Sequence, residues 1–276
     1  MEQLIDTLPL PQGLRNLDIS SLKQVAEELR HRLISSVSQS GGHFASSLGT
    51  VELSVALHHV FDTPNDKLIW DVGHQGYIHK MLTGRINQLG SIRKKDGLSG
   101  FLRREESEYD AFGAGHAGTS ISAALGMAEA FSKTDPKRSV VAIIGDGSIT
   151  AGMAMEALNH AGALKRRLIV VLNDNDMSIS PNVGALSWLF SKAVTSKLPT
   201  IARQSFKDLH KKGYVPDLVY KAIDRAEEAA AGFFSGGPAA FFESFGLRYI
   251  GPLDGHNIED LVTALSHAKD QDGPVV

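Results

Sequence analysis

Residues 140–177 constrain the fold most, because two apolar runs there are separated by a single predicted helix. The first run, at 140–144, is β-branched and too short for an amphipathic helix, which is typical of a buried parallel strand. Apolar residues at helical spacing follow, and a second apolar run occupies 168–172. The stretch therefore predicts a β-α-β unit.

Polar residues follow both predicted strands, as Gly145-Asp146-Gly147 and Asn173-Asp174-Asn175. In open parallel sheets, ligands bind at the carboxyl ends of the strands. The glycines let backbone N–H groups approach an anion, and a helix beginning near Ile149 would direct its positive end at a phosphate. Asp146 and Asn175 offer the oxygen ligands that suit Mg²⁺. Asp-Gly is also a common turn, but the two strand ends together predict a metal-diphosphate site.

Three more glycine-rich turns each carry a histidine. His43 follows a Gly-Gly pair and precedes a predicted helix, His74 follows a predicted strand at 67–72, and His116 lies within 112–120. His43 alone is as readily a solvated loop residue. Taken with the metal-diphosphate unit, the three histidines are expected to line one crevice at the carboxyl edge of the sheet.

Other polar residues have plainer interpretations. His58 and His59 lie in the middle of a predicted helix and are interpreted as packing or surface residues, whereas His79 is a weaker site candidate than His74. The basic residues 93–95 and the acidic pair 105–106 are interpreted as a solvated face.

The carboxyl-terminal part of the chain is less regular. Residues 178–237 have helical stretches between Lys-rich and Gly-rich joints, and they predict an excursion from the core. A short strand is predicted at 247–250, and a Gly-rich turn with His256 follows it. Residues 273–276 resemble the first half of another buried strand, so we expect the chain to end within an element.

Composition narrows the class of protein. The 276 residues are 42% hydrophobic and 21% charged, as in soluble globular proteins, and a net charge of -3 does not favour nucleic acid or anionic membrane. The absence of cysteine excludes a thiolate metal site and a cysteine nucleophile. No apolar run approaches the ~20 residues of a membrane helix, and the amino terminus has no secretory or transit features. We therefore expect a cytoplasmic protein.

Six segments carry a family resemblance. They are HFASSLGTVEL, WDVGHQGYIHK, ESEYDAFGAGHAGTSIS, GDGSITAGMAMEALNHAG, NDNDMSIS and YIGPLDGHN. In this order they resemble the 1-deoxy-D-xylulose-5-phosphate synthases, which are thiamine diphosphate enzymes related to transketolase. The resemblance covers nearly the whole chain but only the amino-terminal half of those proteins. It implies an α/β fold with a mostly parallel sheet flanked by helices. Residues 1–276 would form one thiamine diphosphate/Mg-binding domain, truncated before a pyrimidine-binding second domain and a third.

The resemblance also implies roles for single residues. The implied Mg²⁺ ligands are Asp146, Asn175 and the backbone carbonyl of Met177. The implied cofactor contacts are His74, Gly115, His116, Ala117, Gly147, Ser148 and Asn175. His43 and His256 would be catalytic and would handle protons near the reacting carbon. Gly118 stands where that family usually has serine, so we expect the segment to lose a hydroxyl and some pre-organisation.

The implied reaction condenses pyruvate with D-glyceraldehyde 3-phosphate and releases CO₂, for isoprenoid, thiamine and pyridoxal precursor synthesis. The activating glutamate of such enzymes lies in the second domain, so we expect this chain alone to be inactive, to bind cofactor weakly and to expose an apolar docking face. The complete protein would be a homodimer. Two alternatives stay open, namely the amino-terminal subunit of a split transketolase and a non-catalytic cofactor-binding remnant.

Overall fold

The computed structural model describes residues 3–174 and 237–276, so the predicted excursion at 178–237 lies outside the described residues except for Gly237. The amino-terminal elements are α1 (Leu4–Thr7), η1 (Gln12–Asn16), α2 (Ile19–Ser40), α3 (Phe44–Leu48), α4 (Val51–Val60), β1 (Lys67–Trp70), α5 (Tyr77–Lys80), η2 (Met81–Arg85) and η3 (Ile86–Ser91). The elements that follow are α6 (Ser120–Thr134), β2 (Val140–Gly145), α7 (Asp146–Ile149), α8 (Gly152–Leu164), β3 (Leu168–Asn173), α12 (Gly237–Ser244), α13 (Ile258–Lys269) and β4 (Pro274–Val275).

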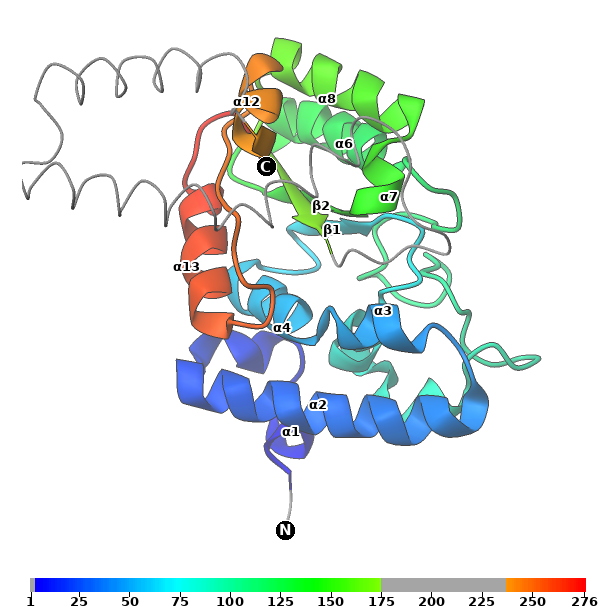
Figure 1. Cartoon of the computed structure of the whole chain (residues 1–276). Coiled ribbons are helices and arrows are strands. Elements are labelled where there is room, and N and C mark those ends of the chain that lie inside the picture. The colour runs from blue at the N-terminus through cyan, green and yellow to red at the C-terminus, as the bar shows by residue number, and fades with distance from the viewer. Residues whose placement is uncertain (1–2, 175–236) are drawn as a thin grey trace, which may run out of the picture.

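The described strands form one parallel sheet in the order β1-β2-β3-β4 (Figure 1). The predicted β-α-β unit is confirmed, since β2 and β3 are neighbours and Gly145 lies opposite Asn173. The strand predicted at the carboxyl terminus is also confirmed as β4. The strand predicted at 247–250 is wrong, because that segment makes only an isolated bridge between Arg248 and Val275.

Helices cover both faces of the sheet, as Figure 1 shows. Alternate residues of β2 enter different cores because side chains of a strand point to opposite faces. Val140, Ala142 and Ile144 pack in the core formed with α6 and α8, whereas Val141 and Ile143 pack in the core formed with α4 and α13. Burial on both faces explains why the strands are continuous apolar runs rather than alternating ones.

A further layer covers the outer side of α4. The 22-residue helix α2 begins after Asp18, whose side chain caps it by accepting a hydrogen bond from the Ser21 N–H. Its buried stripe, which includes Leu22, Leu29 and Leu33, packs in a third core with residues of α4 and α5. None of the helices in the described ranges is long and apolar enough to cross a membrane.

Candidate functional site

The glycine-rich segment 113–119 is tied to the carboxyl end of β1. Asp71 follows β1 and is 1% exposed. Its Oδ1 accepts the Gly118 N–H at 2.9 Å, and its Oδ2 accepts the N–H of Ser120, the first residue of α6, at 3.1 Å. The carboxylate thus lies at the positive amino-terminal end of α6, where negative charge is favourable. Asp71 was not among the sequence-predicted site residues, although its place directly after a strand was a usable signal.

The same segment contacts the turn after β2. Gly118 has φ +80°, and a Cβ placed there would lie 2.6 Å from the Ala151 Cβ. The loosening expected from Gly118 is therefore not what the geometry favours, because its N–H is held by Asp71 and its Cα by the turn. The carboxyl ends of β1 and β2 and the 113–119 segment thus meet at one edge of the sheet.

The turn after β2 carries the predicted metal and diphosphate residues. Asp146 begins α7 and is 8% exposed, whereas Gly147 is exposed and Ser148 is half-buried. The helix predicted from near Ile149 is confirmed as α8, although it begins at Gly152 and the short helix α7 before it was not predicted. The four-residue α7 ends at Ile149, and Ala151, with extended backbone angles, caps the separate helix α8. The break turns the chain so that α8 can pack against α6.

His74 and Gln75 follow β1 and carry buried polar atoms that have no partner among the described residues. These atoms are His74 Nδ1 and Gln75 Nε2. Gln75 is 3% exposed, and its Oε1 accepts a hydrogen bond of 3.4 Å from Asn173 Nδ2 at the end of β3. Burial, and secondarily the charge of His43, lowers the pKa of His74. Buried polar atoms without partners are costly, so their presence here fits a site built to receive a polar ligand.

His43 lies beside His74, as predicted. Their ring centroids are 5.8 Å apart in an edge arrangement. The His43 backbone N–H donates to the Tyr77 hydroxyl at 3.2 Å, and the same oxygen lies 3.2 Å from His43 Nδ1. Partial burial and the nearby Arg93 charge lower the pKa of His43, although a hydrogen bond to the Gly100 backbone opposes them. A neutral imidazole is therefore favoured near neutral pH, as a proton acceptor requires.

The other two histidines are more exposed than this pair. Gly115, His116 and Ala117 are all exposed, and no contact recorded between described residues joins the His116 ring to His43 or His74. His256 is exposed and its Nδ1 lies 3.0 Å from Glu52 Oε2, a carboxylate that also pairs with Arg30. His43 and His74 are therefore neighbours, whereas the expectation that His116 lines the same crevice stays a prediction.

The interpretation of 105–106 as a solvated face is wrong for one of its residues. The Glu105 side chain is 72% exposed, but Glu106 is 15% exposed and pairs with the fully buried Lys80. His58 and His79 are packing residues, as interpreted for His58, with His58 Nε2 and His79 Nδ1 3.0 Å apart. Burial lowers the pKa of both imidazoles.

The residues present suit a diphosphate better than the described part of the chain suits a metal. The Gly147 N–H, the Ser148 hydroxyl and Gln75 Nε2 are hydrogen-bond donors of the kind that hold phosphate oxygens, and His74 Nδ1 is a further donor when it carries the ring proton. Within 3–174 and 237–276, no three acidic, histidine or cysteine side chains are grouped to hold a metal ion. Of the predicted Mg²⁺ ligands, only Asp146 is described, since Asn175 and Met177 lie outside the described residues.

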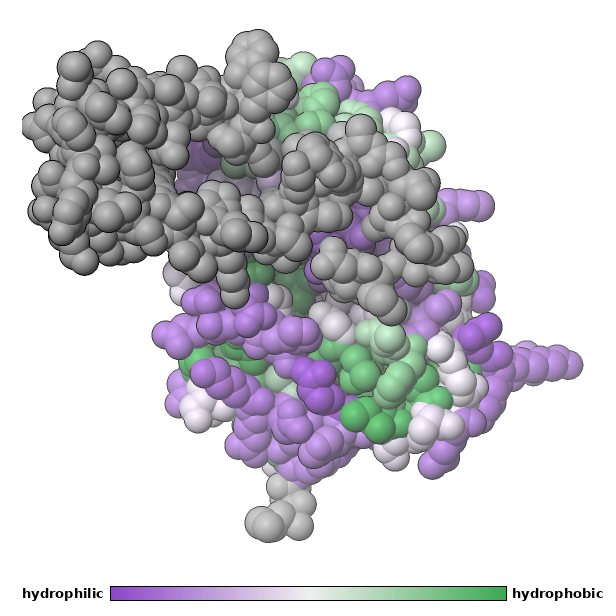
Figure 2. Space-filling model, viewed as in Figure 1, coloured by the Kyte–Doolittle hydropathy of each residue, from purple (hydrophilic) through white to green (hydrophobic). Residues whose placement is uncertain are grey.

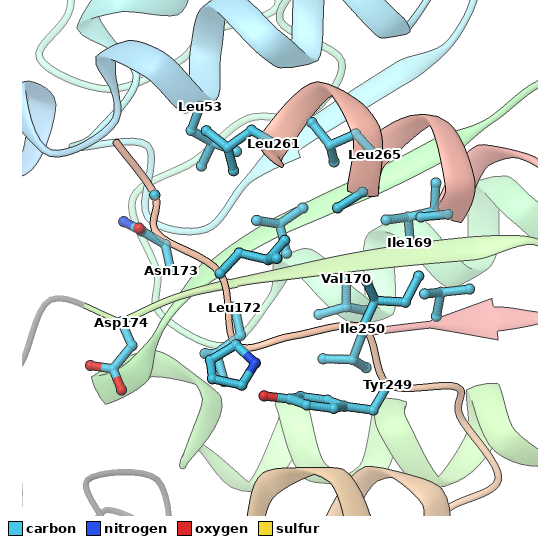
Figure 3. A pocket seen from close by; sticks show the side chains of 18 of the residues that line it. Leu53, Ile169, Val170, Leu172, Asn173, Asp174, Tyr249, Ile250, Leu261 and Leu265 are labelled. Atoms are coloured by element: carbon cyan, nitrogen blue, oxygen red, sulfur yellow. The ribbon is translucent and has the colours of Figure 1, made fainter. Parts of the chain in front are cut away.

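A cavity of about 370 Å³ lies elsewhere, between β3 and α13 (Figure 3). Its walls are mostly apolar, with Leu53 and Leu265 on one side and Tyr249 on the other, and Asn173 and Asp174 form its polar end. It includes neither His43, His74 nor Asp146. Its apolar lining does not suit a diphosphate, so the histidine-bearing edge is the better candidate site.

Apolar side chains gather on the surface in the region of α2 and α3 (Figure 2). Ile34 on α2 and Phe44 on α3 are about two-fifths exposed, at 40% and 39%. Phe44 directly follows His43, so this apolar surface borders the candidate site. It agrees with the expected docking face without identifying what docks there.

Comparison with known proteins places these features in a family. The sequence matches the family described as 1-deoxy-D-xylulose-5-phosphate synthase over residues 5–276. A 1-deoxy-D-xylulose-5-phosphate synthase from Methylobacillus flagellatus is 51% identical over 274 residues, which are 99% of this chain and 44% of that relative. The chain therefore spans less than half the length of this relative.

Solved structures support the fold. A transketolase from Leishmania mexicana aligns with a TM-score of 0.66 at 21% identity, over 94% of this chain and 36% of its own. A transketolase mutant from Pichia stipitis aligns with a TM-score of 0.64 at 19% identity, over 92% of this chain and 35% of its own. At such identities the likeness shows a shared fold, which is the predicted parallel sheet flanked by helices.

Proposed function

Since this chain belongs to the 1-deoxy-D-xylulose-5-phosphate synthase family, we propose that it is the cofactor-binding, amino-terminal part of such an enzyme. The complete enzyme would condense pyruvate with D-glyceraldehyde 3-phosphate and release CO₂, with thiamine diphosphate and Mg²⁺ as cofactors. One observation carries the proposal. His74 at the end of β1, Asp146 at the end of β2 and the segment 113–119 meet at the carboxyl edge of a parallel sheet.

Residues at this edge have distinct parts in holding the cofactor. Asp146, together with Asn175 and the Met177 carbonyl, would hold Mg²⁺ against the diphosphate. Gly147, Ser148, His74 and the backbone of Gly115, His116 and Ala117 would bind the cofactor itself. The exposure of 115–117 suits this role, because a backbone contact does not need the His116 ring to point inward. Thiamine diphosphate would supply the electron sink for loss of CO₂ and formation of the carbon–carbon bond.

His43 and His256 would move protons. The lowered pKa of His43 favours the neutral ring, and its contact with Tyr77 fixes the ring's position, so it suits a proton acceptor beside the bound cofactor. His256 is oriented by Glu52, whose other carboxylate oxygen is paired with Arg30. Glu52 would thus hold the His256 ring in one orientation for a proton transfer.

The remaining parts of the proposal concern the complete protein. Residues 1–276 would act as one cofactor-binding domain that needs a pyrimidine-binding domain to supply the activating glutamate. The complete protein would be a cytoplasmic homodimer. This chain alone would then bind cofactor weakly and release no CO₂ from pyruvate.

Supplying the missing part tests the proposed activity. We expect the full 276-residue chain, mixed with the carboxyl-terminal part of the Methylobacillus flagellatus relative, to release CO₂ from pyruvate in a D-glyceraldehyde 3-phosphate-dependent way. Neither part alone should do so. His43→Ala should lower the rate by about 100-fold or more, as loss of a general acid–base group does.

The exposed His31 provides the matched control, since His31→Ala removes an imidazole that pairs with Glu27 at the surface. Its rate should equal that of the unchanged chain. The proposal is wrong if the mixture stays inactive while the intact relative is active, or if His43→Ala and His31→Ala behave alike.

A further inference from the structure

Four charged side chains form a buried network behind the His43 site. Lys80 and Asp110 are fully buried, Arg85 is 5% exposed and Glu106 is 15% exposed. Lys80 pairs with Glu106, while Arg85 binds Asp110 through two hydrogen bonds of 2.8 and 2.7 Å. Arg85 also lies 3.5 Å from Glu106, so the two pairs form one network without net charge.

Stability alone does not explain this network. Removing charges from water is costly. A protein in which apolar residues of similar volume replace a buried ion pair is often as stable as the original, or more stable. The hydrogen bonds from Arg85 and His79 to Asp110 are strong enough to hold its pKa well below the ordinary value, even though burial raises it. Such a network does, however, fix the position of any other group that its carboxylate oxygens bind.

Those oxygens bind the backbone of the segment 99–103. Glu106 Oε1 accepts the Ser99 N–H at 2.7 Å, and Asp110 Oδ2 accepts the Arg103 N–H at 2.9 Å. Each end of this short segment is thus held by one carboxylate of the network.

The middle of the segment contacts His43. The Phe101 ring centroid lies 5.3 Å from that of His43, with the ring planes at 38°, and the Gly100 backbone is hydrogen-bonded to the imidazole. Lys80 is also the last residue of α5, whose first residue, Tyr77, contacts His43 Nδ1 at 3.2 Å. The Lys80–Glu106 pair therefore joins the two walls between which the imidazole lies.

We propose that Glu106, through the side-chain oxygen that accepts the Ser99 N–H, is a positioning residue that fixes residues 99–101 against the His43 imidazole. The importance of Glu106 for the reaction rests on the proposed function of His43. The contact between residues 99–101 and the His43 ring does not depend on that function. The conventional alternative is a purely structural ion pair, which would not depend on keeping a side-chain acceptor for the Ser99 backbone N–H.

Two double variants of the full chain separate these interpretations. Lys80→Met with Glu106→Gln removes both charges and keeps a side-chain oxygen for the Ser99 N–H. Lys80→Met with Glu106→Leu removes the charges and the oxygen, with side chains of similar volume that the core can accept. Glu105→Leu is the matched control, because Glu105 is the adjacent, exposed carboxylate.

Two measurements report on the contact without cofactor or activity. The first is the NMR signal of the histidine ring protons, with His43 assigned from His43→Gln, since the Phe101 ring shifts them at this distance. The second is hydrogen exchange of the Ser99 amide. We expect the variant with Lys80→Met and Glu106→Gln (Met/Gln) and the Glu105→Leu control to keep the His43 signals and the slow Ser99 exchange of the unchanged chain. The variant with Lys80→Met and Glu106→Leu is called Met/Leu. The Met/Leu variant should move the His43 signals and speed exchange of the Ser99 amide about tenfold, the effect of losing one charge-assisted hydrogen bond.

Phe101→Leu supplies an independent reference, because it removes the ring and leaves the network intact. Its His43 signals should move in the same direction as those of the Met/Leu variant. The proposal is overturned if both double variants leave the His43 ring signals unchanged. It is also overturned if both variants shift those signals equally, because the effect would then come from the loss of charge. Failure here would leave the proposed activity standing, since no cofactor enters the experiment.

Discussion

Asp71→Ala should destabilise the chain by about 3 kcal/mol, because two buried backbone N–H groups lose a charged acceptor. The carboxylate accepts the Gly118 and Ser120 N–H groups and lies at the amino-terminal end of α6. Its loss should release residues 113–119 from the end of β1 and weaken binding of thiamine diphosphate by tenfold or more. Urea denaturation measures the free energy of unfolding, and hydrogen exchange at Gly118 and Ser120 locates the change.

Asp135→Ala is the matched control for this prediction. Asp135 is an exposed acidic residue at the other end of the same helix, where negative charge is not stabilising. Its removal should change the free energy of unfolding by about 0.5 kcal/mol or less. If Asp71→Ala were as mild as Asp135→Ala, Asp71 would not be the anchor of the glycine-rich segment.

Gly118→Ser should cost about 2 kcal/mol of stability, even though serine is the residue the family resemblance leads one to expect there. A side chain at φ +80° is strained, and its Cβ would lie 2.6 Å from the Ala151 Cβ. Adding Ala151→Gly should recover part of the loss, because it removes the contact but not the backbone strain. Thermal or urea unfolding of the single and double variants measures both effects.

Gly126 offers a control at which an added side chain should raise stability instead of lowering it. It lies exposed within α6, and a Cβ added there would meet nothing within 4 Å. Gly126→Ala should therefore stabilise the chain by about 0.5–1 kcal/mol, as alanine does in a helix interior. A Gly118→Ser chain as stable as the unchanged one would mean that residues 113–119 can move away from Ala151.

The strands of the sheet could be predicted from the sequence because they are buried on both faces. The runs at 140–144 and 168–172 are continuous and apolar, and such a pattern has few alternatives once Gly-rich turns delimit it. Their order also placed Asp146 at the carboxyl edge. The break between α7 and α8 was missed because Thr150 and Ala151 carry no turn signal and the helical spacing continues across them.

Side-chain pairing over long separations could not be predicted in the same way. Glu106 follows Lys80 by 26 residues, and Glu52 precedes His256 by 204, so neither pair leaves a periodic pattern. The available signal was local. His79 and Lys80 interrupt the apolar residues from Ile78 to Leu82, which indicates polar residues that need partners. A Gly-rich turn indicates the position of a backbone and not the direction of a side chain, so the sequence could not show where the His116 ring points.

Calorimetric titration of thiamine diphosphate into the 276-residue chain, with and without Mg²⁺, tests the central claim most directly. We expect weak binding that requires Mg²⁺ and disappears in Asp146→Ala, and that becomes tighter when the carboxyl-terminal part of the relative is added. Binding that is equal without Mg²⁺ and in Asp146→Ala would contradict the account. So would an absence of binding even in the presence of that carboxyl-terminal part.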